Sequence, residues 1–488
     1  MKNSFSLAAA LFALQCLAGP RLSPDRVVKD IKTKGLRYDL ENLNRIGQEN
    51  DGNRAFGLPG FNASMDFILE RTEKFCKDMD TSIQSFIYPF EQTRNISVAG
   101  PDGEDVYVIT LIYNPATPVP AGITAPLIDT PVNDETGSGC LEEDWEGIDA
   151  TGKLALVKRG LCAISDKLKL ARAHGALGVL LYNQDPGTDY GSATLGAENR
   201  YDVLPVGVIP LEVGTEWKER LAAGEVLEVN LLVDSILEDR ETWNIISETK
   251  EGDPDNVIML GAHLDSVQAG PGVNDDGSGT AALLEIMSSF RKYRGFKNKV
   301  RFAWWGAEEV GLAGSLFYTN NLTSEEADKI RYYFNYDMIG SPAPVYVVYD
   351  GEEIGTTKLL DYIAAYGKNS TLGSFGSSSD YVGFLQLGIP SSGIFTGAGA
   401  PEDPCYHLAC DDIDNIDWEA ITINAKAAAR VAADFALSLE GIPRRNATEA
   451  STTPNRKRDL AVAEWGSLLA TSAAGKPCSH EHEHDTMV

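Results

Sequence analysis

The region from Thr242 to Leu439 alternates short apolar segments with amphipathic ones. The segments DNVIMLGAHLD, VRFAWWGAEE and RYYFNYDMIG have the length and composition of buried strands, and each ends in polar residues. GTAALLEIMSSFRKY and the closing WEAITINAKAAARVAADFALSL have the spacing of helices. The alternation predicts an α/β fold with a mostly parallel central sheet and helices on both faces.

Acidic and histidine side chains follow these strands, at the edge where parallel sheets place their active sites. The fragments are GAHLDSV with His263 and Asp265, GVNDDGSG with Asp275, AWWGAEE with Glu308 and Glu309, FNYDMIG with Asp337, and CYHLACDD with Tyr406 and His407. Any single fragment also fits a common turn or helix start. Together they indicate a cation, because so many carboxylates at one edge would repel one another. Three carboxylate ligands with two neutral histidines carry −3, so two divalent ions would leave +1, enough to hold one hydroxide.

The length of the chain indicates how many units it folds into, and its charge limits the classes of partner it can bind. A chain of 488 residues predicts two folded units with processed ends. Asp and Glu outnumber Lys and Arg by 71 to 42, which argues against nucleic acid as a partner because a phosphate backbone needs a basic face.

The N-terminus has the pattern of a secretory signal. Residues 1–18 combine Lys2, the apolar run Leu7–Leu17 and small residues before Ala18, and this run is too short for the ~20 apolar residues of a membrane span. No later segment is long and apolar enough to be a span. We therefore expect a secreted, extracellular protein, with a vacuolar location less favoured. Residues 19–35 are either a short propeptide or the mature N-terminus, and residues 441–488 read as a flexible tail whose HEHEHD end could bind metal weakly.

Secretion changes how the cysteines and asparagines are interpreted. Six cysteines follow the signal, and proximity in sequence favours the disulfides Cys140–Cys162 and Cys405–Cys410. Cys76 and Cys478 could pair with each other or remain free. Glycosylation is expected at several of the N-x-S/T sequons, which begin at Asn62, Asn95, Asn321, Asn369 and Asn446.

Residues 95–235 have a different pattern from the flanking segments. Short β-rich runs such as KLALVKRG and GVLLYN are separated by turn residues, with one helix at SDKLKLARAHGA. The stretch from Gly139 through DATGKLALVKRGLC to GVLLYN resembles a protease-associated domain. That resemblance implies a non-catalytic insert that restricts access to an active site or binds a partner. The catalytic domain would then comprise residues 36–94, expected to be mostly helical, and 236–440.

The strand-end fragments resemble the co-catalytic dizinc aminopeptidase family, which includes vacuolar aminopeptidase Y and the secreted fungal leucine aminopeptidases. The resemblance covers about 200 residues of the catalytic region. It implies two Zn²⁺ per chain, one held by His263 and Asp337 and the other by Glu309 and His407. Asp275 would bridge the two ions.

The same resemblance implies roles for the neighbouring residues. Asp265 would orient His263, and Glu308 would be the general base that later passes its proton to the leaving amine. Tyr406 would hydrogen-bond the oxyanion, and the Asp275–Asp276 peptide is expected to be cis. The short Cys405–Cys410 loop would brace His407.

These features predict a secreted metalloaminopeptidase that hydrolyses an apolar, leucine-like N-terminal residue from peptides. We favour a monomer, although the oligomeric state is open. A dizinc carboxypeptidase or dipeptidase of the same fold would use the same ligands, and a binding protein that has lost catalysis would keep the fold. A glutaminyl cyclase is related in fold, but the insert disfavours it.

Overall fold

The computed structural model describes residues 19–188, 193–350 and 354–446. The predicted signal peptide, Cys478 and the histidine-rich end lie outside these residues. The described chain forms two compact units, one made of residues up to Tyr88 and from Glu241, the other of Pro89–Arg240. Strands β1 and β7 each run from one unit into the other.

The first unit is a sheet covered by helices. Its helices are α2 (Pro24–Asp30), α3 (Thr33–Gln48), α4 (Pro59–Glu73), α7 (Gly277–Phe290), α8 (Ala313–Asn320), α9 (Ser324–Lys329), α10 (Ile354–Ala364), α11 (Tyr381–Gln386) and α12 (Trp418–Leu437). Its strands are β1 (Met79–Ala99), β7 (Glu228–Thr249), β8 (Asp253–His263), β9 (Asn298–Trp305), β10 (Ile330–Tyr336), β11 (Tyr346–Tyr349), β12 (Ser370–Gly373) and β13 (Ser391–Phe395).

The central strands of this unit are parallel, as the sequence predicts. The order is β12-β11-β13-β10-β8-β9-β7. β8 pairs in parallel with β9 and β10, and β10 pairs in parallel with β13. Antiparallel pairs occur where β7 joins β9 and where β11 joins β13. The carboxyl ends of β8, β9, β10 and β13 therefore meet at one edge of the sheet.

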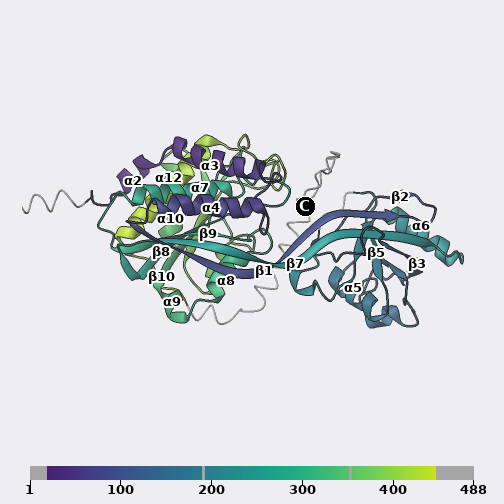
Figure 1. Ribbon diagram of the computed structural model, residues 1–488. Helices are drawn as coiled ribbons and strands as arrows, with labels where there is room; N and C mark the ends of the chain where they lie inside the picture. The colour runs from purple at the N-terminus through teal and green to yellow at the C-terminus, as the bar shows by residue number, and fades with distance from the viewer. Residues whose placement is uncertain (1–18, 189–192, 351–353, 447–488) are drawn as a thin grey trace, which may run out of the picture. The chain divides into compact units, whose positions relative to one another are not determined.

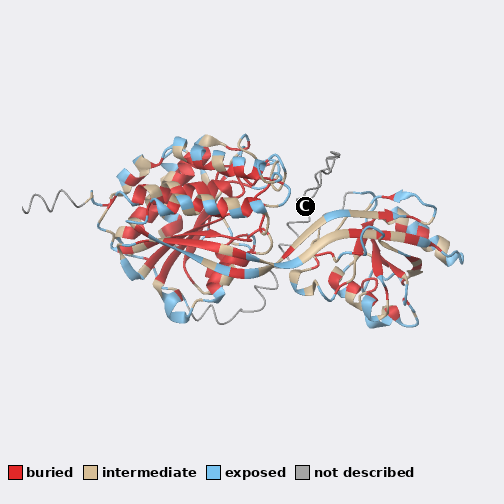
Figure 2. Ribbon diagram, in the orientation of Figure 1, coloured by how far each residue is buried: buried red, intermediate tan, exposed pale blue. Residues whose placement is uncertain are grey.

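Both faces of the sheet are buried, which explains why the strands read as continuous apolar runs. Ile258 and Leu260 of β8 join the core under α3, α7 and α12, whereas Met259 between them joins the core under α8 and α11. Figure 1 shows α3, α7 and α12 on one side of the sheet and α8 and α9 on the other. Figure 2 shows the central strands mostly buried, with the exposed positions of β8 at its first residues, Asp253–Asp255.

Of two N-terminal segments, the sequence left one open and the other differs from its expectation. Residues 24–30 form α2, and Val27 and Ile31 are fully buried in the main core, so this part of residues 19–35 belongs to the folded unit. Residues 79–92, expected to be helical, lie in β1. In β1 exposed and buried positions are mixed over MDTSIQSFIYPFEQ, and this segment has the β-branched and aromatic content of a strand.

The second unit contains more helix than the sequence predicts. Its remaining elements are β2 (Asp105–Val106), β3 (Ile123–Asp129), β4 (Leu154–Lys158), α5 (Ile164–Ala173), β5 (Gly178–Tyr182), β6 (Val206–Ile209) and α6 (Leu211–Ala222), with 3-10 turns at Glu142–Trp145 and Ala197–Asn199. Strands β3, β4, β5 and β6 are parallel neighbours. The expected helix is α5. Helix α6 was missed, although one of its own residues, Trp217, is a large buried side chain.

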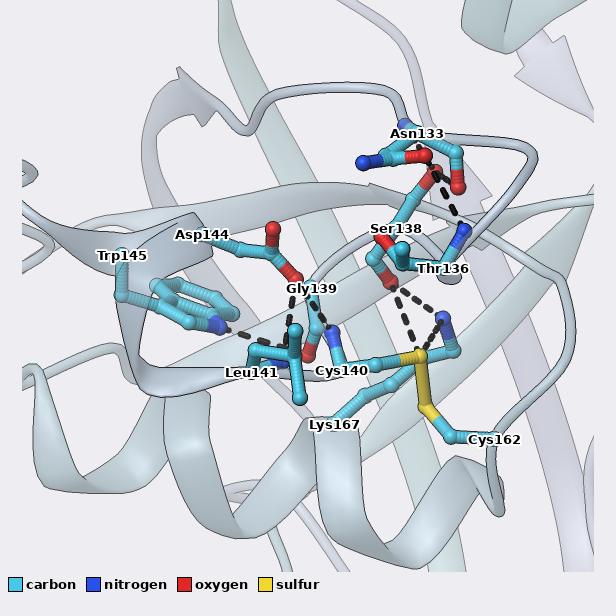
Figure 3. Close-up of a disulfide and its surroundings, with 10 residues drawn as sticks. All are labelled: Asn133, Thr136, Ser138, Gly139, Cys140, Leu141, Asp144, Trp145, Cys162 and Lys167. Atoms are coloured by element: carbon cyan, nitrogen blue, oxygen red, sulfur yellow. Dashed lines mark hydrogen bonds between the residues drawn. A yellow bond between two sulfur atoms is a disulfide. The ribbon is translucent and has the colours of Figure 1, made fainter.

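The Cys140–Cys162 disulfide predicted from the sequence lies in this second unit. Figure 3 shows the bridge beside Lys167 of α5, whose ammonium donates to the Ser138 carbonyl and lies 3.4 Å from Cys140 Sγ. The Asp144 carboxylate accepts from the backbone N–H groups of Cys140 and Leu141 at 2.8 and 2.9 Å. Both charged groups thus have hydrogen-bond partners on the Ser138–Leu141 segment.

Among the described residues, no helix is long and apolar enough to cross a membrane. The second predicted disulfide, Cys405–Cys410, is present in the first unit, and Cys76 is exposed with a free thiol.

Candidate active site at the carboxyl edge of the sheet

The strand-end residues singled out from the sequence converge on one buried cluster. His263 is the last residue of β8, Glu308 and Glu309 follow β9, and Asp337 follows β10. His407 lies in the loop after β13, and Asp275 directly precedes Asp276, the N-cap of α7. All of these except His407 and Asp337 are less than 9% exposed. The parallel register of the strands brings together residues far apart in sequence.

Asp275 lies between the two histidines. Its Oδ1 is 3.1 Å from Nε2 of His263, and its Oδ2 is 3.2 Å from Nε2 of His407. Glu309 Oε2 lies 3.1 Å from the same nitrogen of His407, and Asp337 Oδ1 lies 3.7 Å from Nε2 of His263. The five residues thus form two groups that share one carboxylate.

Glu308 lies at the His263 side of this arrangement. Its Oε2 is 3.9 Å from His263 Nε2, and its side chain is buried. On the same side, Ser379 donates to Asp337 Oδ2 at 2.6 Å and accepts from the Asn335 amide at 2.8 Å. Ser379 therefore fixes the orientation of Asp337.

Asp265 contacts His263 differently from the expectation. His263 Nδ1 lies 3.1 Å from the backbone carbonyl of Asp265 and 3.9 Å from its carboxylate. The carboxylate instead accepts from the backbone N–H groups of Glu308 and Glu309, at 3.0 and 3.2 Å. Asp265 thus positions the Glu308–Glu309 turn with its side chain and faces the imidazole with its main chain.

Two further aspartates position the backbone of the cluster. Asp276 accepts from the N–H groups of His263, Gly279 and Met338 at 3.1, 2.9 and 3.2 Å. Asp411 accepts from the N–H groups of Asn274 and Asp275 at 2.9 and 3.0 Å. These bonds fix the segment that presents Asp275, whose peptide bond to Asp276 is cis as expected.

Left-handed backbone occurs beside three of the site residues. Ala307 before Glu308 has φ 58°, Met338 after Asp337 has φ 52°, and His407 itself has φ 58°. Non-glycine residues in this region cost about 1–3 kcal/mol each, and such strain concentrates at functional sites. The surrounding hydrogen bonds hold these conformations in place.

Burial dominates the electrostatics of the cluster. It raises the pKa of Glu308 well above its ordinary value, against the opposing effect of His263. Burial alone would lower the pKa of His407, but the carboxylates of Glu309 and Asp275 outweigh it and raise that pKa to about 10. The cluster has more carboxylates than compensating side-chain cations, which favours the binding of protons or metal ions.

The donor atoms fit a metal ion. His263, Asp275 and Glu309 each offer a ligand atom within 4.8 Å of the others, and so do His263, Asp276 and Asp337. Glu309 Oε1 is buried without a hydrogen-bond partner among the described residues. Asp276 is the weaker ligand candidate because both of its oxygens accept backbone N–H groups. Carboxylate and imidazole ligands suit zinc.

Comparison with known proteins assigns the chain to a family. The model of Peptidase family M28 matches residues 244–432, and that of the PA domain matches residues 123–217. Aminopeptidase Y of Saccharomyces cerevisiae is 36% identical over 87% of this chain and 82% of its own length. The chain belongs to peptidase family M28. By homology its activity is that of an aminopeptidase, a hydrolase of peptide bonds.

Other relatives and solved structures resemble this M28 peptidase. The probable leucine aminopeptidase 2 of Aspergillus oryzae is 34% identical over 88% of this chain and 90% of its own length. A zinc aminopeptidase from Bacillus subtilis has a TM-score of 0.62 at 27% identity, covering 82% of this chain and 94% of the other. An aminopeptidase from Aneurinibacillus has a TM-score of 0.68 at 24% identity, covering 87% and 97%, and this similarity supports the fold.

The loop that carries His407 in this M28 peptidase is closed by Cys405–Cys410. The Tyr406 ring stacks on the His407 imidazole with centroids 3.8 Å apart. Burial raises the pKa of Tyr406 well above its ordinary value, so its hydroxyl keeps its proton and can donate it.

Sequence reasoning missed two residues that contact this site. Asp411 stands in the quoted CYHLACDD fragment, but nothing in that fragment assigns it a role. Arg54 lies between α3 and α4 and is fully buried against the loop after β8. A weak signal exists for Arg54, because it is the only charged residue between Asp51 and Asp66.

The residues predicted to carry glycans share one property. Each of these asparagines is exposed, namely Asn62, Asn95, Asn321, Asn369 and Asn446. Exposure is what a glycan acceptor requires, and the modification itself stays a prediction.

Proposed function

We propose that this M28 peptidase is a secreted aminopeptidase that uses two zinc ions to remove one apolar, leucine-like residue from the N-terminus of a peptide. The observation that carries the proposal is the position of Asp275, with one carboxylate oxygen near each of two histidine Nε2 atoms. A shared carboxylate between two ligand groups is what a two-metal site requires.

The ligand assignment follows from these groups. His263 and Asp337 would hold one zinc, Glu309 and His407 the other, and Asp275 would bridge them. The unpartnered Glu309 Oε1 supports its role as a ligand. When bound, the ions would polarise the scissile carbonyl and lower the pKa of a bound water to about 7.

The remaining residues would move protons and orient groups. Glu308 would take the proton of the attacking water and return it to the leaving amine, the role of a general base that a carboxylate beside the ligands can fill. Tyr406, protonated at neutral pH, would donate to the oxyanion. Asp265 would hold the Glu308–Glu309 turn through its two backbone hydrogen bonds.

Restriction to N-termini would follow if the substrate's free amine binds at this acidic edge. Asp380 is buried there, burial raises its pKa to about 7, and its Oδ1 has no hydrogen-bond partner among the described residues. An amine that carries a positive charge would find such carboxylates favourable, whereas an acylated amine would not.

The test compares leucine p-nitroanilide with its N-acetyl derivative and measures zinc content by elemental analysis. We expect two zinc ions per chain and cleavage of the free amine alone, lost with a chelator and restored by zinc. Two ions without cleavage of either substrate would point to a carboxypeptidase or dipeptidase. Absence of both metal and cleavage would overturn the enzymatic proposal in favour of a binding protein.

A further inference from the structure

Arg54 is a buried cation whose hydrogen bonds go to a single loop. Its Nε donates to the Pro271 carbonyl at 2.7 Å, its Nη2 to Gly272 at 2.6 Å, and its Nη1 to Leu264. Its backbone N–H donates to Ser266 Oγ at 2.9 Å. The side chain is fully buried. We call residues 264–272 the β8 loop.

The β8 loop joins two of the proposed zinc ligands. It begins directly after His263 and ends three residues before Asp275. Its backbone packs closely against the site: a Cβ on Gly272 would lie 2.3 Å from the Asp275 carbonyl, and one on Gly270 would lie 2.1 Å from the carbonyl of Leu408, next to His407. A displacement of the loop would therefore also displace His263 and Asp275, the ligands on either side of it.

The charge of Arg54 complements the cluster without competing for its ligand atoms. The acidic groups that act electrostatically on the guanidinium are Asp265, Asp411, Asp276 and Asp275. Among the described residues, however, its side-chain donors all go to backbone carbonyls. The carboxylate oxygens of Asp275 stay available to a metal, while a permanent positive charge lowers the cost of gathering the acids.

We propose that Arg54 is a positioning residue of the metal site, which holds the β8 loop so that His263 and Asp275 are preorganised for zinc. The inference rests on the proposed two-zinc function. It differs from a purely structural role, in which the guanidinium would fill space and stabilise the fold without affecting the ligands.

The experiment measures zinc affinity of the full-length protein in competition with a chromogenic chelator, for the wild type, Arg54→Lys and Arg54→Gln. Loss of a group that orients metal ligands costs on the order of 10–100-fold in metal affinity, and we expect a loss in this range for both variants. Lysine keeps the charge, but it lacks the planar guanidinium whose three separate nitrogens each reach a different carbonyl. At saturating zinc, KM for leucine p-nitroanilide should stay at the wild-type value.

Arg331→Lys and Arg331→Gln are the matched controls. Arg331 is also buried and lies near the start of β10, in the same sheet. It donates to the Ile442 carbonyl at 3.0 Å and to the Asn256 side-chain oxygen at 2.8 Å. These contacts lie at the amino end of the strand, away from the cluster. We expect the Arg331 variants to lower the melting temperature while zinc affinity stays within about twofold of the wild type.

A milder variant keeps the test decisive if the Arg54 variants fail to fold. Ser266→Ala removes the acceptor of the Arg54 N–H and the donor to the Gly270 carbonyl at 2.9 Å, and should weaken zinc binding several-fold. Unchanged zinc affinity in the folded Arg54 variants, or in Ser266→Ala where they do not fold, would overturn the inference. A wild type that binds no zinc would instead overturn the proposed function and this inference with it.

Discussion

Two clusters of charged residues, one in each unit, satisfy their polar groups in opposite ways. In the second unit, Lys167 and Asp144 beside the Cys140–Cys162 bridge direct their hydrogen bonds to backbone groups of the Ser138–Leu141 segment. At the sheet edge of the first unit, carboxylates face one another and two histidines, and Glu309 Oε1 is left without a partner among the described residues.

The difference separates a structural cluster from a functional one. Buried polar groups normally satisfy one another, so a set that satisfies itself needs no ligand. A set that gathers acids beyond its cations, with strained backbone at Ala307, Met338 and His407, is typical of a functional site and favours the binding of a cation. The following experiments test this contrast, from the largest expected effect to the smallest.

Glu308→Gln should lower kcat on leucine p-nitroanilide by on the order of 10²–10⁴-fold, because a general base is lost. Zinc content should be unchanged. Glu309→Gln is the matched control on the same turn, and it should lower zinc content instead. Equal zinc loss in both variants would show that the two glutamates do not divide the roles as assigned.

Replacing both cysteines of the Cys140–Cys162 bridge with serine should destabilise the second unit by about 3 kcal/mol, from the chain entropy of a loop with a sequence separation of 22. Chemical denaturation followed by fluorescence measures this loss. Activity on leucine p-nitroanilide under native conditions should stay at the wild-type level. A fall in zinc affinity would break the proposed separation between the two clusters.

Replacing Cys405 and Cys410 with serine should have the converse effect. The loop closed is short, with a sequence separation of 5, so the entropic loss is about 2 kcal/mol. Because His407 lies in it with φ 58°, zinc affinity should fall by about 10-fold. Competition with a chelator gives the affinity, and an unchanged value would mean that the strand ends alone hold His407.

Lys167→Met should leave activity on leucine p-nitroanilide unchanged and affect only the pH dependence of stability. Burial lowers the pKa of Lys167 to about 8, whereas a lysine of the unfolded chain has a pKa of about 10.4. Between these values the unfolded state binds more protons, so the stability of the wild type relative to the variant should rise from pH 8 to pH 10. Urea denaturation of both proteins across this range measures it. A stability difference that does not change between pH 8 and pH 10 would show that burial does not lower the pKa of Lys167.

The strand-end residues were predictable because parallel strands make local patterns converge. His263, Glu308, Glu309 and Asp337 each follow an apolar run directly, and the register then places them at one edge. The two disulfides could be predicted because each pair is close in sequence. Strand β1 was missed because its exposed, polar positions hide the strand pattern, and α6 because its buried face rests largely on Trp217.

The contacts that position the site could not be read from the sequence. Asp265 was expected to orient His263, and the tertiary structure turns its backbone carbonyl to the imidazole while its carboxylate bonds the Glu308 and Glu309 backbone. Asp411 and Asp276 likewise bond backbone N–H groups that any residue would offer. Arg54 donates to backbone carbonyls, which every residue has. The sequence therefore cannot show which carbonyls these are, and only the folded chain identifies them.

The Arg54 contacts also set an order of events during synthesis. Its hydrogen bonds span sequence separations of 210 to 218 residues, and the whole of Pro89–Arg240 is translated in between. At 5–20 residues per second the ribosome needs about 10–40 s to deliver the β8 loop. A nascent chain must therefore keep its α3 and α4 segments from aggregating over this interval, while the second unit already has its own core to fold. A fragment starting where the M28 match begins, at residue 244, would never receive the guanidinium, and the carbonyls of Leu264, Pro271 and Gly272 would lose that donor.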